Sequence, residues 1–307
     1  MHMINIIDKR KYFYAFSLTI TTASLIMLIM WGLRLGKDFT GGTRMNIEFS
    51  QEESIGQVQN SLKDLNLKEL SIQKSQNNSI AINYGSSDEV LNNSVREKLK
   101  ELDANYKELR TEFTGASVSD QIKRNALLAI ILANIGIGIF IAWAFRKVSR
   151  PVPSWQYGVG AVVALVHDVL ITTGVFVFLG KFHGVEVGVP FVAALLTILG
   201  FSVHDTIVVY DRIKENLLKS GKKDEFEDVV NKSLNETMAR SINTSFTVLI
   251  VLLAITIFGG ESIRFFSIAL LVGIFFGTYS SIFVASALLV TSYKMKLKKL
   301  STKNYNL

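Results

Sequence analysis

Asp205 lies inside the apolar run VGVPFVAALLTILGFSVHDTIVVY, which otherwise has the composition of a membrane-spanning helix. Burying a carboxylate at that depth costs at least about 2.5–3.5 kcal/mol on insertion scales. Chains accept this cost mainly where the group faces the interior of a helix bundle and moves protons or ions. The residue therefore predicts a membrane protein with a functional polar centre.

Five further apolar segments accompany this run, and each of the six is long enough to cross a hydrocarbon core of about 30 Å. The chain of 307 residues, 49% of them hydrophobic, places them at about 13–33, 125–145, 158–179, 187–210, 238–258 and 265–290. Trp31 and charged residues follow the first segment without a small-residue cleavage site, so we expect a retained anchor and no signal peptide. The pattern predicts a polytopic α-helical membrane protein with six transmembrane helices.

Lys and Arg are distributed unevenly around these segments. Seventeen lie in the N-terminus, the second-to-third and fourth-to-fifth connections and the tail, whereas the two short loops opposite carry only Lys181 and Arg264. The positive-inside rule then places both termini in the cytoplasm. Lys123 and Arg124, on the outer side, weaken the pattern without reversing it.

This orientation divides the chain into four parts. We expect a cytoplasmic N-terminus with helix 1 at 1–36, an extracytoplasmic domain at 37–120, helices 2–6 at 121–293 with a cytoplasmic loop at 211–237, and a basic cytoplasmic tail at 294–307. The loop at 211–237 has helical spacing, which predicts an amphipathic helix packed on the membrane surface.

The net charge of +7 does not indicate nucleic-acid binding. Residues 37–120 contain ten Lys and Arg against fourteen Asp and Glu, so the excess positive charge lies in short segments beside apolar runs. Basic residues there set topology and contact lipid headgroups. The absence of Cys excludes disulfides, thiolate metal sites and cysteine nucleophiles.

Residues 37–120 predict a small α+β domain between helices 1 and 2. TRMNIEF, KELSIQK, SIAINY and YKELRTEF read as strands, and EESIGQVQNSLKDL and SDEVLNNSVREKLKEL have helical spacing. The resulting order βαββαβ is that of the ferredoxin-like split unit. No catalytic group stands out in it, which favours a binding or lever domain.

Arg240 is the candidate partner of Asp205. It opens the fifth helix before the polar stretch Ser241, Asn243 and Thr244, and both groups can lie near the cytoplasmic third of the membrane. A nearby guanidinium stabilises a charged carboxylate whereas burial disfavours it, so a carboxylate balanced between them can load and release a proton. The alternative is a permanent Asp–Arg clamp that only orders the bundle.

His167 and Asp168 lie in the middle of the third helix, where Thr172 continues a small and polar face suited to close packing. Asp168 either joins the proton path or belongs to a local hydrogen-bond network. His204 also precedes an aspartate, but the two His-Asp pairs lie on different helices and HExxH is absent. We therefore expect no metal and no cofactor.

Two glycine motifs have structural interpretations. Gly273 and Gly277 in GIFFG allow close helix packing on the sixth helix. The loop DFTGGT, with Asp38, Gly41 and Gly42, lacks the GK[ST] ending of a phosphate loop and leads into a strand. We expect it to form a tight join between the first helix and the soluble domain.

Together these segments resemble the SecD/SecF family of the bacterial Sec protein-export machinery. DFTGGT, HDVLITTGVFVFLG, GFSVHDTIVVYDRIKENL, NETMARSINTS and GTYSSIFVAS run in family order from residue 38 to residue 286. Several motifs in the right order are far more specific than any one of them.

The resemblance implies a member of the resistance-nodulation-division superfamily in the bacterial plasma membrane. Its implied partners are SecD, the SecYEG channel, exported polypeptides and lipid, and the implied energy source is the proton-motive force. Asp205 matches the family's intramembrane aspartate and Arg240 its basic residue, which implies proton conduction. His167 and Asp168 match a recurrent pair. Only the six-span half is present, so the SecD half must come from another chain. The coupling ion, H⁺ or Na⁺, stays open.

Three rivals stay open at this point. An exporter of small molecules or lipids from the same superfamily usually carries a duplicated membrane half. An intramembrane hydrolase would use the His-Asp pairs and would be metal-sensitive. A purely structural scaffold would be indifferent to replacement of Asp205.

Overall fold

The computed structural model describes residues 4–50, 54–74, 78–86, 88–146, 151–220 and 224–305. The chain forms two compact units. The strand unit comprises Arg34–Leu128 and Glu186–Val189, and the helix unit comprises Met1–Leu33, Ala129–Val185 and Pro190–Leu307. The basic residues Lys147, Arg150, Lys222 and Lys223, counted above for topology, and the predicted helix start at Glu52 and Glu53 lie outside the described residues.

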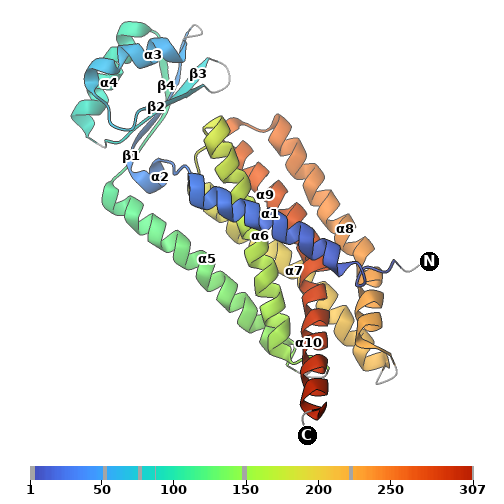
Figure 1. Cartoon of the computed structure of the whole chain (residues 1–307). Coiled ribbons are helices and arrows are strands. Elements are labelled where there is room, and N and C mark those ends of the chain that lie inside the picture. Colours follow the sequence, from blue (N-terminus) through green and yellow to red (C-terminus); the bar gives the residue numbers. More distant parts are fainter. Residues whose placement is uncertain are drawn as a thin grey trace. The chain divides into compact units, whose positions relative to one another are not determined.

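Six helical segments have the length and apolar composition to span a membrane. They are α1 (Arg10–Trp31), α5 (Ala116–Ala144), α6 (Ser154–His183), α7 (Val189–Ser220), α8 (Phe226–Phe258) and a composite sixth span (Figure 1). The sixth span consists of α9 (Glu261–Ser280), a π-helical turn η2 (Ser281–Ala285) and α10 (Ser286–Tyr305).

The helices α6, α7 and the sixth span form the centre of the helix unit. Their most apolar stretches are 56%, 44% and 56% buried, against 11%, 6% and 17% in α1, α5 and α8. Small residues on α6 also let α1 approach closely, since a Cβ at Gly174 would lie 2.4 Å from the Ser24 side chain of α1. Close approach at small residues is the usual basis of helix association in membranes.

Residues 211–237 differ from the predicted surface-bound helix. Residues up to Ser220 continue α7, and α8 begins at Phe226, so the charged segment extends two spans as a helical hairpin. Polar pairs hold the two arms together: Arg212 Nε lies 2.6 Å from Glu236 Oε2, and Asn216 Nδ2 lies 3.0 Å from Ser233 Oγ. The apolar side chains of this segment belong to a buried core that also includes the N-terminal Ile6 and Ile7. Helical spacing alone could not distinguish this packing from packing on lipid.

The N-terminal segment is bound by α8 through side-chain amides. Asn231 Oδ1 accepts from the Ile6 amide at 2.8 Å, and Asn235 Oδ1 accepts from the Ile4 amide at 2.9 Å. Glu227 of α8 pairs with Arg10 of α1 and with Lys294 of α10. These contacts join three spans at one end of the helix unit.

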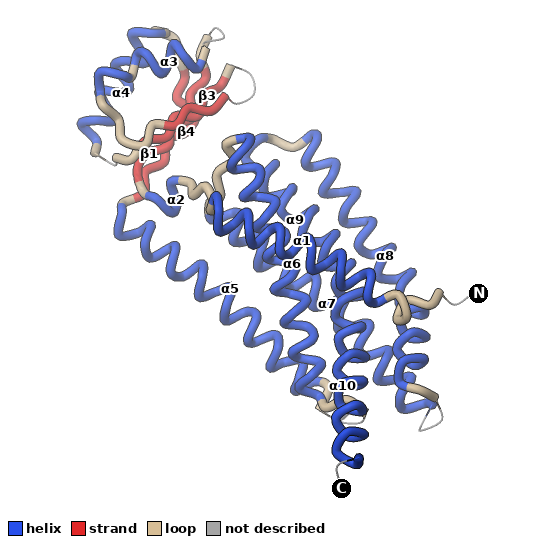
Figure 2. Tube along the Cα trace, in the orientation of Figure 1, coloured by secondary structure: helices blue, strands red, loops and turns tan. Residues whose placement is uncertain are grey.

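The strand unit contains four antiparallel strands in the order β2-β3-β1-β4. Figure 2 draws the strands in red. Its elements are α2 (Lys37–Thr40), β1 (Gly42–Glu48), α3 (Ile55–Ser61), η1 (Lys63–Leu65), β2 (Ser71–Lys74), β3 (Ser79–Tyr84), α4 (Glu89–Leu102) and β4 (Lys107–Thr114). From β1 to β4 the sequence of strands and longer helices is the one that the pattern predicts.

The alternation of the strands explains the core of this unit. Met45 and Ile47 of β1 and Ile82 of β3 share one face and are fully buried against Val58 of α3 and Leu99 of α4. Side chains two residues apart on a strand face the same side of the sheet, so these residues form one apolar layer against which both helices pack. Ser54 begins α3 with a capping box to Gln57, which satisfies amides that the first helical turn leaves unpaired.

Gly42 fixes the start of β1 against β3. Its φ is +111°, and a Cβ there would lie 2.1 Å from the Tyr84 carbonyl oxygen. We expect Gly42→Ala to destabilise the sheet by at least about 2 kcal/mol, because both the backbone conformation and the strand contact are lost. Hydrogen exchange in the full chain should accelerate in β1 and β3 peptides.

Gly56→Ala is the matched control, since its Cβ would meet only the Ser54 hydroxyl at 4.0 Å within α3. Alanine favours helix over glycine, so exchange should stay equal or become slower. Equal exchange in both variants would contradict the role of Gly42.

Candidate functional site

Asp205 lies on α7 and is 7% exposed. Its Oδ1 accepts a hydrogen bond of 2.5 Å from the Ser241 hydroxyl of α8. Its Oδ2 is buried and has no partner among the described residues. An enclosed carboxylate with one oxygen unpaired is costly, and among the described residues Asp205 is the one acidic side chain with such an oxygen.

The structure brings Ser241, and not Arg240, to Asp205. Arg240 is exposed in this chain, and no ion pair or hydrogen bond joins it to Asp205 in the part of the chain that the structure describes. Successive residues of an α-helix point about 100° apart, so a serine that faces α7 turns its predecessor away. Arg240 therefore lies at the expected level along the helix axis, next to the serine that binds Asp205, but the expected contact between its guanidinium and Asp205 is not found among the described residues.

Asp168 of α6 has the opposite surroundings. It is fully buried, and its Oδ2 accepts from Ser202 of α7 at 2.7 Å and from Ser280 of α9 at 2.9 Å. Its Oδ1 lies 2.9 Å from His167 Nδ1. Both oxygens are therefore satisfied, and the groups that satisfy them come from three helices.

His167 and Thr172 complete this cluster on α6. His167 is 6% exposed, its ring stacks near Tyr279 of α9 at 6.3 Å, and its Nε2 has no partner among the described residues. Thr172 donates to the Asp168 carbonyl at 2.8 Å, a bond within its own helix. His204, in contrast, is exposed. Among the described residues no group of three His, Asp or Glu could hold a metal ion.

Gly273 and Gly277 face α7 one turn apart. A Cβ at Gly273 would lie 2.1 Å from the Ile198 side chain, and one at Gly277 would lie 3.0 Å from Ser202 Cβ. Gly277 thus gives Ser202 the space to reach Asp168. The π-helical turn beyond it was not predicted, although the run of hydroxyl residues Thr278–Ser281 indicated interhelical hydrogen bonds.

Asp38 belongs to a second cluster, which we call the clasp and define as residues 34–38 and 186–189 of the strand unit. The Val187 amide donates to the Arg34 carbonyl at 2.8 Å, and the Gly36 amide donates to the Val187 carbonyl at 2.9 Å. Asp38 Oδ2 accepts from the Val189 amide at 2.8 Å, at the first residue of α7. The aspartate therefore caps a helix that lies 151 residues further along the chain.

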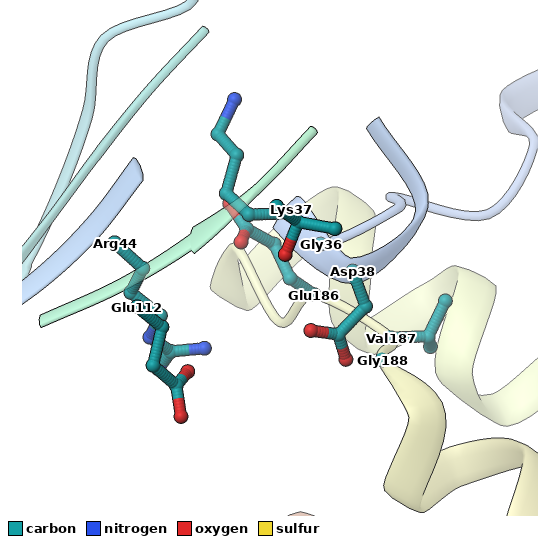
Figure 3. Close-up of a pocket in the computed structure, with 9 residues that line it drawn as sticks. Gly36, Lys37, Asp38, Arg44, Glu112, Glu186, Val187 and Gly188 are labelled. Carbon is teal, nitrogen blue, oxygen red and sulfur yellow. The ribbon is translucent and has the colours of Figure 1, made fainter. Parts of the chain in front are cut away.

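Charged side chains of both signs surround the clasp (Figure 3). Lys37, Asp38, Arg44, Glu112 and Glu186 line a small hollow there. Arg34 pairs with Glu186 at 3.6 Å. Gly41 and Gly42 follow with φ of +77° and +111°, which turns the chain from α2 into β1. The mixed charges favour a structural junction over an anion or metal site.

We expect Asp38→Ala to lose about 1 kcal/mol of helix-capping energy. The amides at the start of α7 should then exchange about fivefold faster, because exchange reports local opening. Asp38→Asn retains an acceptor and should lie close to wild type. Equal acceleration in the Ala and Asn variants would show that the cap is not the cause.

The clasp also predicts a dependence on pH. Burial raises the pKa of Glu186 above its usual range, against the lowering effect of Arg34. A carboxyl group whose pKa is higher in the folded than in the unfolded protein stabilises the fold while it is protonated. This stabilisation is complete below the pKa of the unfolded state, 4.5, and is lost as the pH rises through the pKa of the folded state. Intrinsically corrected exchange at Val187 should therefore be faster at pH 8 than at pH 5, and Glu186→Gln should flatten the profile. Slower exchange at pH 8 would contradict this.

Comparison with known proteins places these features in a family context. Residues 94–295 match the family model "Protein export membrane protein SecD/SecF, C-terminal". A protein translocase subunit SecF from Thermobaculum terrenum is 45% identical over 301 residues, covering 94% of each chain. One from Sebaldella termitidis is 38% identical and covers 98% of this chain and 96% of its own length.

A solved structure is similar over most of the chain. The crystal structure of SecDF, a translocon-associated membrane protein from Thermus thermophilus, superposes with a TM-score of 0.82 at 31% identity. The match covers 95% of this chain and 39% of the SecDF chain, so this chain spans about two fifths of that protein. Six membrane helices and a small antiparallel sheet are common features of the match.

Proposed function

The chain belongs to the SecD/SecF family of protein-export membrane proteins, and we propose that it works with a SecD partner to promote polypeptide export by the proton-motive force. It is a multi-pass membrane protein of the SecF type. The relatives named SecF are called translocase subunits, which supports a role in transport and not in bond-breaking catalysis.

One observation carries the energetic part of this proposal. Asp205 of α7 is buried against α8, yet only one of its two oxygens has a hydrogen-bond partner among the described residues. Protonation at the unpaired oxygen removes the buried charge, and deprotonation restores it. The free energy of the α7–α8 contact therefore depends on whether the proton is present.

The position of Arg240 indicates how α8 would move when the protonation of Asp205 changes. It directly precedes Ser241 on α8, so a rotation of α8 by about 100° exchanges the hydroxyl for the guanidinium at Asp205. A charged Asp205 favours the guanidinium, and a protonated Asp205 is satisfied by the hydroxyl. Loading and release of the proton then drive α8 between two orientations.

The strand unit supplies the proposed site of action. Its four-stranded sheet between α1 and α5 is, in this proposal, the extracytoplasmic ferredoxin-like domain, and both termini are cytoplasmic. The basic residues counted in the sequence support that orientation by the positive-inside rule. Exported polypeptides and the SecYEG channel are the further partners, with no cofactor and no nucleic acid.

Asp205→Asn should remove the export stimulation that depends on the proton-motive force. The measurement is translocation into inverted membrane vesicles that contain the chain and its SecD partner, with and without a protonophore. An asparagine matches the shape of the protonated aspartate but cannot exchange a proton, so the variant should be insensitive to the protonophore and no better than vesicles without the chain.

Asp211→Asn on the same helix is the matched control, because the Asp211 side chain is 70% exposed. It should behave as wild type. A protonophore-sensitive advantage in Asp205→Asn vesicles would overturn the proposal. Stimulation that follows a sodium gradient in the presence of the protonophore would assign Na⁺ as the coupling ion.

A further inference from the structure

The π-helical turn of the sixth span begins directly after the serine that binds Asp168. The turn covers Ser281–Ala285, and the Ser286 hydroxyl donates to the Ser281 carbonyl at 3.1 Å. Such turns insert one residue into a helix and occur frequently at functional sites. Here Ser280 donates to Asp168 on α6, while the Ser281 hydroxyl lies 3.1 Å from the Ser202 carbonyl of α7 and 2.9 Å from the Gly277 carbonyl of its own helix. Two successive side chains thus bond to two different helices.

One face of α7 contacts both the first and the last residue of the π turn. Ser202, Thr206 and Tyr210 recur at four-residue spacing, which places them on one side of the helix. The Thr206 hydroxyl lies 2.8 Å from the Ser281 hydroxyl, and the Tyr210 hydroxyl donates to the Ala285 carbonyl at 3.3 Å. All three side chains are buried.

Asp205 lies on the same helix between Ser202 and Thr206, and its carboxylate faces α8. The helix therefore carries Ser202, Asp205 and Thr206 within about one turn, so the proposed proton site directly adjoins two of the residues that contact the π turn. Any axial shift or rotation of α7 that changes the first set of contacts also moves Asp205.

We propose that Asp168 is a positioning residue that ties α7 to the start of the π turn through Ser202 and Ser280, and so sets the position of Asp205. This rests on the function proposed for Asp205. The two serines bind one oxygen of one fully buried carboxylate, so neither helix can move alone without breaking a charge-assisted hydrogen bond. His167 holds the other oxygen and fixes the carboxylate plane.

Chemistry distinguishes this tie from ordinary packing. A carboxylate can accept from both serines and from His167, whereas a carboxamide offers one accepting oxygen and one donating nitrogen. Asp168→Asn therefore removes the negative charge that strengthens these hydrogen bonds, with almost no change in volume. Ser202→Ala and Ser280→Ala each remove one donor.

The test measures the reactivity of Asp205 with dicyclohexylcarbodiimide, an apolar reagent that adds to protonated carboxyl groups. Membranes that contain the full chain and its SecD partner are treated, and the modified peptides are quantified by mass spectrometry. Wild type should be labelled at Asp205 and not at the enclosed Asp168. Asp168→Asn, Ser202→Ala and Ser280→Ala should each raise the labelling rate of Asp205 by about threefold or more, the population change that one lost hydrogen bond produces.

Ser267→Ala is the matched control, because Ser267 is a buried serine of α9 whose hydroxyl donates only to Ile263 of its own helix among the described contacts. It should label at the wild-type rate. The double variant Ser202→Ala with Ser280→Ala should label no faster than either single variant, because loss of either serine already breaks the link through Asp168.

Three results would overturn the proposal. Unchanged labelling of Asp205 in both serine variants would make the serines packing residues only, and additive rates in the double variant would show that they act independently of Asp168. Both leave the role of Asp205 intact. An Asp205 that is unlabelled in wild type would instead overturn the proposed function, and the tie with it.

Discussion

The lack of water in a bilayer interior governs the helix unit, because each buried polar group must find its partner within the protein. Asp168 meets this constraint completely: donors from α7 and α9 and the adjacent His167 satisfy both carboxylate oxygens. Glycines and serines at the crossing of α7 and α9 make that geometry possible, since a Cβ at Gly277 would crowd Ser202. This one carboxylate thereby joins the three central helices.

Asp205 departs from the same constraint on the same helix. It has a single donor, Ser241, and an oxygen without a described partner. A buried carboxylate whose hydrogen bonds are all made is stabilised in that arrangement, whereas one with an unpaired oxygen carries a free-energy cost that protonation or a new partner can relieve. The two buried aspartates therefore differ in their hydrogen bonding, and our proposal assigns the holding of the helices to Asp168 and the exchange of a proton to Asp205.

Much of this could be predicted from the sequence where the signal is periodic. Hydrophobic length gives the six spans, and alternation with turn residues gives β1 to β4 in the order found along the chain. Contacts between distant segments carry no such period: the cap that Asp38 provides to α7, the π turn at Ser281–Ala285 and the two serines on Asp168 depend on tertiary packing. The loop at 211–237 was misjudged because an amphipathic helix packs equally well on lipid or on a neighbouring helix.

The most direct test is proton movement itself. Liposomes that contain the chain with its SecD partner and an enclosed pH indicator can be given a membrane potential by potassium diffusion. The account predicts potential-driven proton flux with wild type and none above empty liposomes with Asp205→Asn, although both should assemble equally. Equal flux through the two proteins would contradict the assignment of the proton site to Asp205.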